Sequence, residues 1–156
     1  MTNASSAFVS VTAVDVITKM ENIPHMTVME PDLRSAAELV MAQLGPRQRE
    51  VVYAKALATQ LQAIGMLVQV EAPVPIIYTP TAANMTCAPT IVGVERADLL
   101  IMTPWLAIVE CKIAETITVD HANQAKRYAF NCNSQDCYAI SFGRSGTVTV
   151  LQVKLD

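Results

Sequence analysis

The period of the apolar residues changes at Gly65, and this change limits the folds that the chain can adopt. Before Gly65, apolar residues follow helical spacing in two segments, which predicts helices over about 31–44 and 48–64. Pro31 suits the first turn of the first helix, and Gly45-Pro46 ends that helix. After Gly65, apolar residues recur at every second position, as they do in strands. We therefore expect a pair of helices followed by a sheet.

The rest of the chain predicts a sheet that carries one further helix. Extended runs are expected at 67–71 with 74–78, 91–102, 105–113, 137–142 and 147–154. The prolines of the first run mark an edge strand or a bulge. Residues 120–131 have one apolar stripe and predict a helix, whereas residues 79–90 predict a loop. The resulting order, α-α-β-β-β-α-β-β, is typical of an α/β (α+β) sheet with helices packed on it.

The composition suits one domain with an aliphatic core. The chain has 156 residues, of which 52% are hydrophobic and 16% are charged, and this argues against disorder of the whole chain. The net charge of -3 excludes a strongly basic protein that coats nucleic acid through bulk charge. Residues 1–30, which are rich in Thr, Ser and Val, are interpreted as an N-terminal extension to a domain at 31–156.

The sequence predicts an intracellular protein, cytoplasmic or nuclear, that is not secreted and does not enter a membrane. Its apolar runs are shorter than the roughly 18–20 residues that span a bilayer. The apolar stretch near the N-terminus follows no basic segment and is a poor signal peptide. The four cysteines form no CxxC pair, which argues against structural zinc and leaves reduced thiols as the expectation.

Three charged residues fall within the two most apolar runs of the predicted sheet. Asp98 lies in the first of these runs, and Glu110 and Lys112 lie in the second. A buried charge is costly unless it is paired or bound to a metal, so these positions are unusual for charged side chains. Glu110 and Lys112 are two residues apart and project from the same strand face. A hairpin at Thr103-Pro104 would place Asp98 beside Glu110.

Two carboxylates beside a lysine have a chemical use. The carboxylates can hold a hard divalent cation such as Mg²⁺, which lowers the pKa of bound water and stabilises charge on a phosphate. The lysine can hold or deprotonate the attacking water. A Glu-x-Lys pair on a strand is also common on protein surfaces, where it contributes little as an ion pair. Taken alone, the pattern leaves both interpretations open.

Several separated motifs of the chain occur together in a known family. Asp98 followed by Glu110-Cys111-Lys112 resembles the D…(E/D)xK signature of the PD-(D/E)XK nuclease superfamily. Within that superfamily the chain resembles the GxxExxY proteins, in the stretches 44–53, 96–100 and 121–128. The likeness covers residues 32–153 in register. It implies a restriction-endonuclease-like core, in which a mixed sheet is flanked by helices in the order α-β-β-β-α-β.

The resemblance also implies the residues of a metal site. Glu50, Asp98 and Glu110 would bind Mg²⁺ or Mn²⁺ through their carboxylates. The backbone carbonyl of Cys111 would be a further ligand, and Lys112 would be the catalytic lysine. On this reading Glu110 and Asp98 are both catalytic residues and metal ligands.

Four other polar residues are candidates for contacts with water or phosphate. The resemblance implies that Gln124 reaches the site and positions a water molecule or a phosphate. His121 lies one helical turn before Gln124 and is a candidate nucleic-acid contact. Arg47 stands where the family has a glycine and is a candidate phosphate contact. Arg96 is another such candidate, or forms a local ion pair.

The predicted function is a metal-dependent phosphodiesterase, an endo- or exonuclease that hydrolyses nucleic acid, with DNA as the expected substrate. The alternative is a non-catalytic or partner-dependent protein on the same fold, associated with nucleic acid or structural and oligomeric. The net charge of -3 predicts weak binding of nucleic acid by the chain alone. The aliphatic surplus favours a homo-oligomer or a protein partner, because exposed apolar area must be covered.

Overall fold

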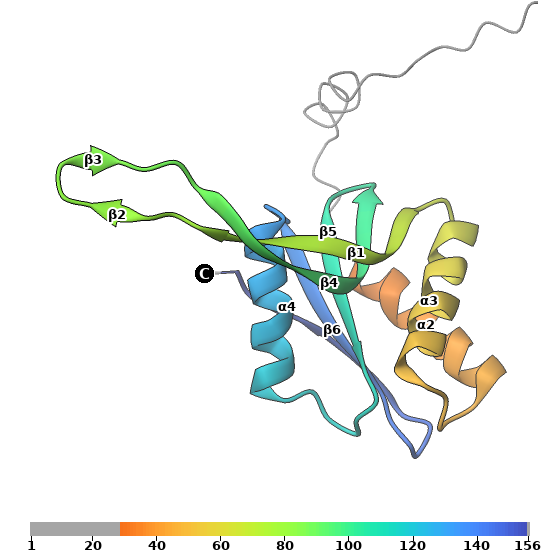
Figure 1. The fold of residues 1–156 in the computed structure, drawn as a ribbon. Coiled ribbons are helices and arrows are strands. Elements are labelled where there is room, and N and C mark those ends of the chain that lie inside the picture. Colours follow the sequence, from red (N-terminus) through yellow and green to blue (C-terminus); the bar gives the residue numbers. More distant parts are fainter. Residues whose placement is uncertain (1–28, 156) are drawn as a thin grey trace, which may run out of the picture.

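The fold is described for residues 29–155 of a computed structural model, so the predicted N-terminal extension lies almost wholly outside the described residues. The elements are, in chain order, α2 (Glu30–Leu44), α3 (Glu50–Ala63), β1 (Leu67–Tyr78), β2 (Thr81–Ala82), β3 (Met85–Thr86), β4 (Thr90–Thr103), β5 (Ala107–Lys112), α4 (Val119–Asn131), β6 (Asp136–Phe142) and β7 (Val148–Gln152) (Figure 1). The division of the chain near residue 31 stays a prediction.

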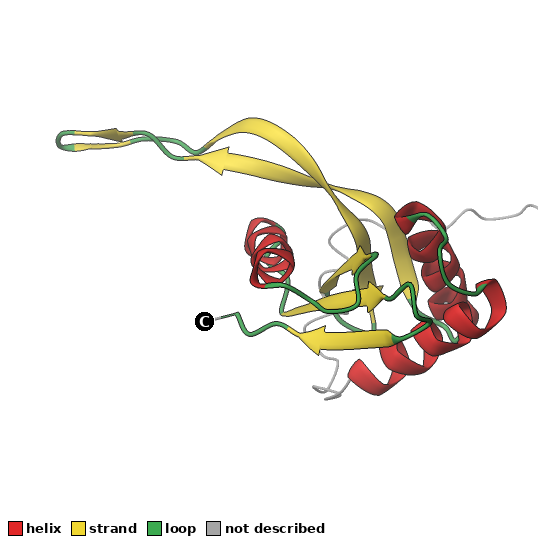
Figure 2. Ribbon diagram, turned by 90° about the horizontal axis from the view of Figure 1, so that it is seen from below, coloured by secondary structure: helices red, strands yellow, loops and turns green. Residues whose placement is uncertain are grey.

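Five strands form one mixed sheet in the order β1-β4-β5-β6-β7. Strands β5 and β6 run parallel and are joined through α4, whereas the other neighbours in the sheet are antiparallel. Helices α2 and α3 cover one side of the sheet and α4 covers the other (Figure 2). The predicted mixed sheet flanked by helices is therefore confirmed. No helix of the described residues is long and apolar enough to span a membrane.

An apolar cluster fills each side of the sheet, and the central strand β5 contributes to both. Val109 and Cys111 pack with α2 and α3, whereas Ile108 packs with Ala125 and Tyr128 of α4. Because β5 is covered on both sides, all of its residues except the last are buried. A charged side chain on this strand must therefore find its partners inside the protein.

Two of the predicted elements differ from the structure. Residues 79–90 were expected to be a loop, but they contain the short hairpin of β2 and β3, whose turn holds Asn84 with a φ of 60°. The segment lacks the apolar alternation that is typical of strands, so periodicity does not predict this hairpin. The second helix begins at Glu50, later than expected, because Arg49 has an extended backbone with φ -71° and ψ 149°, and Arg47 before it has a left-handed φ of 71°.

Candidate active site

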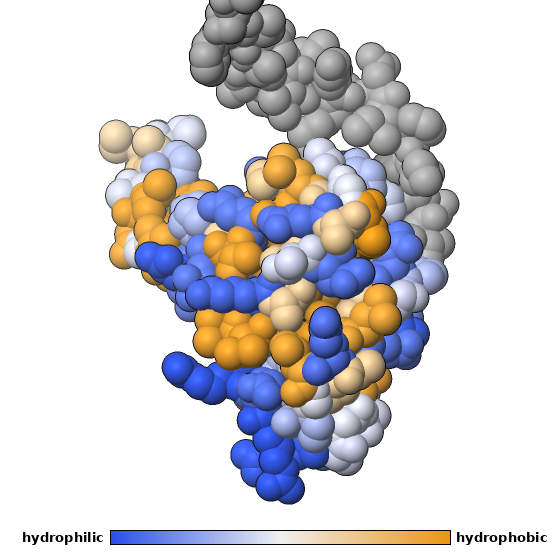
Figure 3. Space-filling view, turned by 90° about the vertical axis from the view of Figure 1, so that its right-hand side faces the viewer, coloured by the Kyte–Doolittle hydropathy of each residue, from blue (hydrophilic) through white to orange (hydrophobic). Residues whose placement is uncertain are grey.

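Several of the elements that carry candidate residues converge at the end of the molecule that is lower in Figure 1. The carboxyl ends of β5 and β6 and the N-termini of α3 and α4 all lie at this end. The space-filling view shows hydrophilic side chains gathered there (Figure 3). Helix N-termini carry partial positive charge and favour anions, so this end of the fold suits a phosphate group.

Asp98 and Glu110 each accept a hydrogen bond from the main chain of the other's strand. The Cys111 N–H donates to Asp98 Oδ2 at 2.7 Å, and the Asp98 N–H donates to Glu110 Oε1 at 3.1 Å. The backbone pairing of β4 with β5 ends at Leu99 and Val109, so the two carboxylates hold the strands together beyond that point. Glu110 is only 1% exposed. The expected neighbourhood of Asp98 and Glu110 is thus confirmed.

Lys112 lies between two carboxylates. Its Nζ is 3.7 Å from Glu110 Oε2 and 3.7 Å from Glu50 Oε1. The second oxygen of Glu50 accepts a hydrogen bond from the Ile113 N–H at 3.4 Å. The structure therefore brings together the side chains of Glu50, Glu110 and Lys112, as the resemblance implied, with Asp98 beside them.

The loop before α3 places Glu50 at the first position of that helix. Tyr53 fastens the loop, since its hydroxyl donates to the Gly45 carbonyl at 2.8 Å and accepts from the Gln48 N–H at 3.2 Å. The ring of Tyr53 stacks on Phe142 of β6, with centroids 4.3 Å apart. Arg47 keeps a left-handed backbone at the position where the resembled family has glycine.

Burial and mutual repulsion make the carboxylates hard to ionise. Burial, and then the charge of Asp98, raise the pKa of Glu110 to about 8. Burial also raises the pKa of Asp98, and the hydrogen bond from Cys111 opposes that rise. Burial raises the pKa of the Cys111 thiol far above its ordinary value, so this thiol is not a nucleophile. The site holds more negative than positive charge when it is ionised.

The donor chemistry of the site fits a hard divalent cation. Three carboxylates offer oxygen ligands, and a cation among them would offset the repulsion that raises the pKa of Glu110. Within residues 29–155, however, no three His, Cys, Asp or Glu side chains are arranged to enclose a metal ion. The oxygens of Glu50 and Glu110 face Lys112 instead. The ligand roles of the carboxylates and of the Cys111 carbonyl stay predictions.

A pocket of about 280 Å³ opens beside the carboxylates and contains two charged residues that the sequence analysis missed. Arg49 and Glu71 line it together with Glu50 and Asp98. Glu71 has a left-handed φ of 51° inside β1, and the sequence does not predict that conformation. Arg49 could have been noticed as a cation next to the expected ligand Glu50. It is the cation that lines this pocket.

Ser141 is a second residue that sequence reasoning missed. It pairs with Lys112 across the parallel strands β5 and β6, so both side chains lie on the same side of the sheet. The side chain is fully buried, and its hydroxyl has no hydrogen-bond partner among the described residues. Buried hydroxyls normally have a partner, so a polar group held in this position invites a functional explanation.

Gln124 and His121 make local contacts that the sequence did not predict. Gln124 Nε2 donates to the Tyr128 hydroxyl at 3.1 Å, one turn further along α4. His121 closes a capping box with Thr118, in which Nδ1 accepts from the Thr118 N–H at 3.2 Å. Thr118 at the start of a helix is the signal that could have revealed this cap. The roles of Gln124 and His121 in binding water or phosphate stay predictions.

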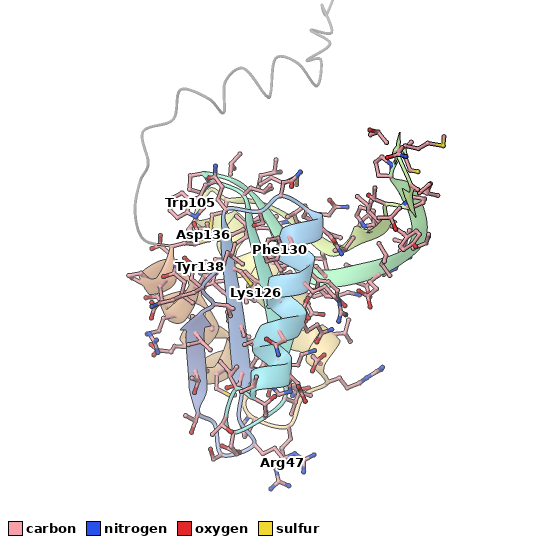
Figure 4. All side chains as sticks on the ribbon, turned by 90° about the vertical axis from the view of Figure 1, so that its left-hand side faces the viewer. Arg47, Trp105, Lys126, Phe130, Asp136 and Tyr138 are labelled. Carbon is pink, nitrogen blue, oxygen red and sulfur yellow. The ribbon has the colours of Figure 1, made fainter. Side chains whose placement is uncertain are left out.

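The two predicted arginine contacts lie outside the pocket lining. Arg47 is exposed and extends from the lower end of the molecule (Figure 4). Arg96 is exposed on β4, two residues before Asp98. The sequence also allowed a local ion pair between Arg96 and Glu95. In the structure Glu95 pairs with Arg127 of α4 instead, at 3.0 Å. Both arginines remain candidates for contact with a longer substrate.

One comparison with known proteins identifies the class of protein to which the chain belongs. Residues 28–153 match the PD-(D/E)XK nuclease superfamily, and the chain belongs to that superfamily, whose members are mostly Mg²⁺-dependent nucleases. No curated protein matches the chain. A solved structure described as the crystal structure of SSO0001 is similar, with a TM-score of 0.43 and 11% identity, over 89% of this chain and 75% of that one.

Proposed function

We propose that this protein is a nuclease that hydrolyses phosphodiester bonds with Mg²⁺ or Mn²⁺ and has DNA as its substrate. The observation that carries the proposal is the junction of Asp98 and Glu110 with Lys112 between buried strands, where three charges would otherwise be costly. We also propose that, within the superfamily, this protein is one of the GxxExxY proteins and that it acts inside the cell.

Each residue has a part in the proposed reaction. Glu50, Asp98, Glu110 and the Cys111 carbonyl would hold the cation. The cation would lower the pKa of a water molecule and stabilise charge that develops on the phosphate. Lys112, which lies 3.7 Å from two of these carboxylates, would orient or deprotonate the attacking water.

Substrate binding would depend on a few local cations. Arg49 lines the pocket and would contact the scissile phosphate, while Arg47 and Arg96 would contact flanking phosphates. Gln124 would position water or phosphate after exchanging its bond to Tyr128 for one to the substrate. Few phosphate contacts fit the weak binding expected of a chain with a net charge of -3.

Cleavage of supercoiled plasmid and of single-stranded DNA in Mg²⁺ or Mn²⁺ tests the proposal. We expect the parent protein to cut and Lys112→Ala to lose roughly 10²–10⁴-fold in rate, the usual contribution of a general acid–base group. Lys55→Ala is the matched control, because Lys55 is an exposed lysine of α3 that neither lines the pocket nor pairs with the carboxylates of the site among the described residues. Equal cutting by all three proteins would point to a contaminating nuclease and overturn the proposal.

One observation favours the alternative of a non-catalytic or partner-dependent protein. In the part of the chain that the structure describes, no three acidic side chains are arranged to enclose a metal ion. Lys112 instead lies between the carboxylates of Glu50 and Glu110. Titration calorimetry with Mn²⁺ separates the two functions. Binding that is lost in Glu110→Gln supports the nuclease, whereas no binding at millimolar metal supports the alternative.

A further inference from the structure

Glu71 lines the pocket beside the carboxylates but takes no part in the proposed reaction. It lies on β1 between the residues that pair with Leu99 and Ala97 of β4, so it stands opposite Asp98. Its side chain is exposed, and within residues 29–155 it has neither an ion pair nor a side-chain hydrogen bond. An acidic side chain without a partner therefore lies beside the place where the proposed reaction occurs.

The left-handed backbone of Glu71 allows two neighbouring residues of β1 to line the same pocket. In a regular strand, neighbouring side chains point to opposite sides, so Val70 and Glu71 could not both do so. Both line the pocket here, and Glu71 has a φ of 51°. The alternation of β1 changes at the same place, because Val68 and Val70 pack with α2 and α3 whereas Val74 packs with α4. The unusual backbone thus serves the position of this side chain.

Glutamate is an unfavourable residue for this backbone conformation. A left-handed backbone suits glycine and costs stability with most other residues, and strain of this kind is concentrated at functional sites. Glycine at position 71 would relieve the strain but would leave the pocket without this carboxylate. The presence of a glutamate therefore indicates a task for the carboxylate itself.

Three kinds of partner for the Glu71 carboxylate can be compared. A phosphate is an anion and is repelled. The proposed cation already has three carboxylate ligands, whose charge exceeds its own, so a fourth would add repulsion. A hydrogen-bond donor remains, because an ionised carboxylate only accepts. The donors of a DNA strand lie on its bases, since its internal sugars and its phosphates carry none.

We propose that Glu71 reads the unpaired base next to the scissile phosphate of a single-stranded substrate, by accepting a hydrogen bond from the amino group of that base. Val51, Ala54 and Val70 give the pocket an apolar wall for the flat face of a base. The volume of about 280 Å³ is just below that of pockets for drug-sized molecules, which suits a single base. A base in a duplex would first have to leave the helix. The inference rests on the proposed nuclease function and names its substrate more closely.

Cleavage of oligo-dC and oligo-dU, two single strands of equal length, tests the proposal. Cytosine carries an amino donor where uracil carries a carbonyl oxygen, which the Glu71 carboxylate repels. We expect the parent to cut oligo-dC faster by roughly tenfold or more. Glu71→Gln should bring the ratio of the two rates close to one, because an amide can also donate to the uracil oxygen. Glu38→Gln, at an exposed glutamate of α2 outside the pocket lining, is the matched control and should keep the ratio.

Failure of this inference is distinct from failure of the nuclease function. Equal rates on the two strands, or a ratio that Glu71→Gln leaves unchanged, would overturn the base contact and leave the nuclease function in place. If the parent cuts neither strand, fluorescence anisotropy of the labelled strands in Ca²⁺ decides. Tighter binding of oligo-dC that Glu71→Gln removes supports the base contact, whereas equal binding overturns it. Loss of Mn²⁺ binding in Glu71→Gln, measured by calorimetry, would make Glu71 a metal ligand and overturn the inference as well.

Two further variants test whether the backbone directs the carboxylate into the pocket. Glu71→Gly relieves the left-handed backbone and Glu71→Ala keeps it, so the glycine variant should have the higher Tm. Both variants should lose the preference for oligo-dC. A glycine variant that melts below the alanine variant would show that residue 71 is not left-handed in solution, and would overturn the inference without any measurement of cleavage.

Discussion

Asp98 on β4 and Glu110 on β5 form reciprocal hydrogen bonds: the carboxylate of each residue accepts from a main-chain N–H of the other strand. The distances are 2.7 Å from the Cys111 N–H to Asp98 and 3.1 Å from the Asp98 N–H to Glu110. These bonds take the place of ladder bonds where β4 and β5 separate. The two residues therefore have a structural task in addition to the proposed chemical one, and substitutions must be chosen to separate the two.

The variants Asp98→Asn and Asp98→Ala together separate the structural role of Asp98 from its proposed chemical role. The amide oxygen of Asn can still accept from the Cys111 N–H, so Asp98→Asn should fold as stably as the parent or more so, because it removes a carboxylate that burial disfavours. Asp98→Ala leaves that buried N–H without a partner and should cost about 1–3 kcal/mol. Chemical denaturation measures the difference, and Mn²⁺ titration should find both variants impaired. Equal stability of the two variants would contradict the structural role.

Stability should depend on pH through Glu110. Its pKa is about 8 in the folded protein, against an ordinary value of 4.5. Below the lower value both states are protonated; between the two values the folded state binds more protons, so the free energy of unfolding falls as pH rises. Above a pH of about 8 both states are ionised, and the free energy of unfolding stays at its lowered value. We expect Tm to fall as pH rises through this window, and Glu110→Gln to remove most of the fall.

The same carboxyl gives an independent test with metal. Because a divalent cation binds the ionised form, Mg²⁺ should raise Tm more near the upper end of this pH window than near the lower end. Calcium-free buffers with matched ionic strength control for general salt effects. An equal effect of Mg²⁺ on the parent and on Glu110→Gln would mean that the cation binds elsewhere.

Ser141 should influence the reaction through Lys112. Removal of a buried hydroxyl without a partner relieves a cost of about 1–3 kcal/mol, so Ser141→Ala should keep or raise the stability. The rate of cleavage should nevertheless fall, because Ser141 is the cross-strand neighbour of Lys112 on the same side of the sheet. Ser145→Ala, in the exposed turn after β6, is the control. An unchanged rate of cleavage together with raised stability would show that Ser141 does not act in the reaction.

The sequence could predict the part of the site that burial makes unusual. Charged residues at 98, 110 and 112 stand out because their strands are otherwise apolar, and strand alternation places them at one position of the sheet. Glu50 was reached only through the resemblance, because a glutamate at the start of a helix is common on protein surfaces. The order of the three helices and of the five strands of the main sheet followed from periodicity together with the proline and glycine positions.

The remaining features depend on tertiary contacts that no local pattern encodes. The hydrogen bond of Gln124 to Tyr128 depends on the side-chain rotamer of Gln124, which periodicity does not predict. The left-handed backbone of Glu71 lies between the paired residues Val70 and Ala72, and the sequence does not indicate it, because Glu is not among the residues that favour this conformation. The β2–β3 hairpin lacks apolar alternation, so its uncharged sequence was interpreted as a loop.

Arg49 and Arg47 should differ in their effect on binding of nucleic acid, although they are two residues apart. Arg49 lines the pocket beside Glu50 and Asp98, so Arg49→Ala should weaken DNA binding roughly tenfold and lower the slope of its salt dependence by about one. Arg47 lies outside that lining, and Arg47→Gly, which suits its φ of 71°, should preserve the fold and weaken binding less. Fluorescence anisotropy with labelled DNA in Ca²⁺, at several salt concentrations, measures both effects. A larger loss in Arg47→Gly than in Arg49→Ala would assign the phosphate contact to the loop before α3 instead of the pocket.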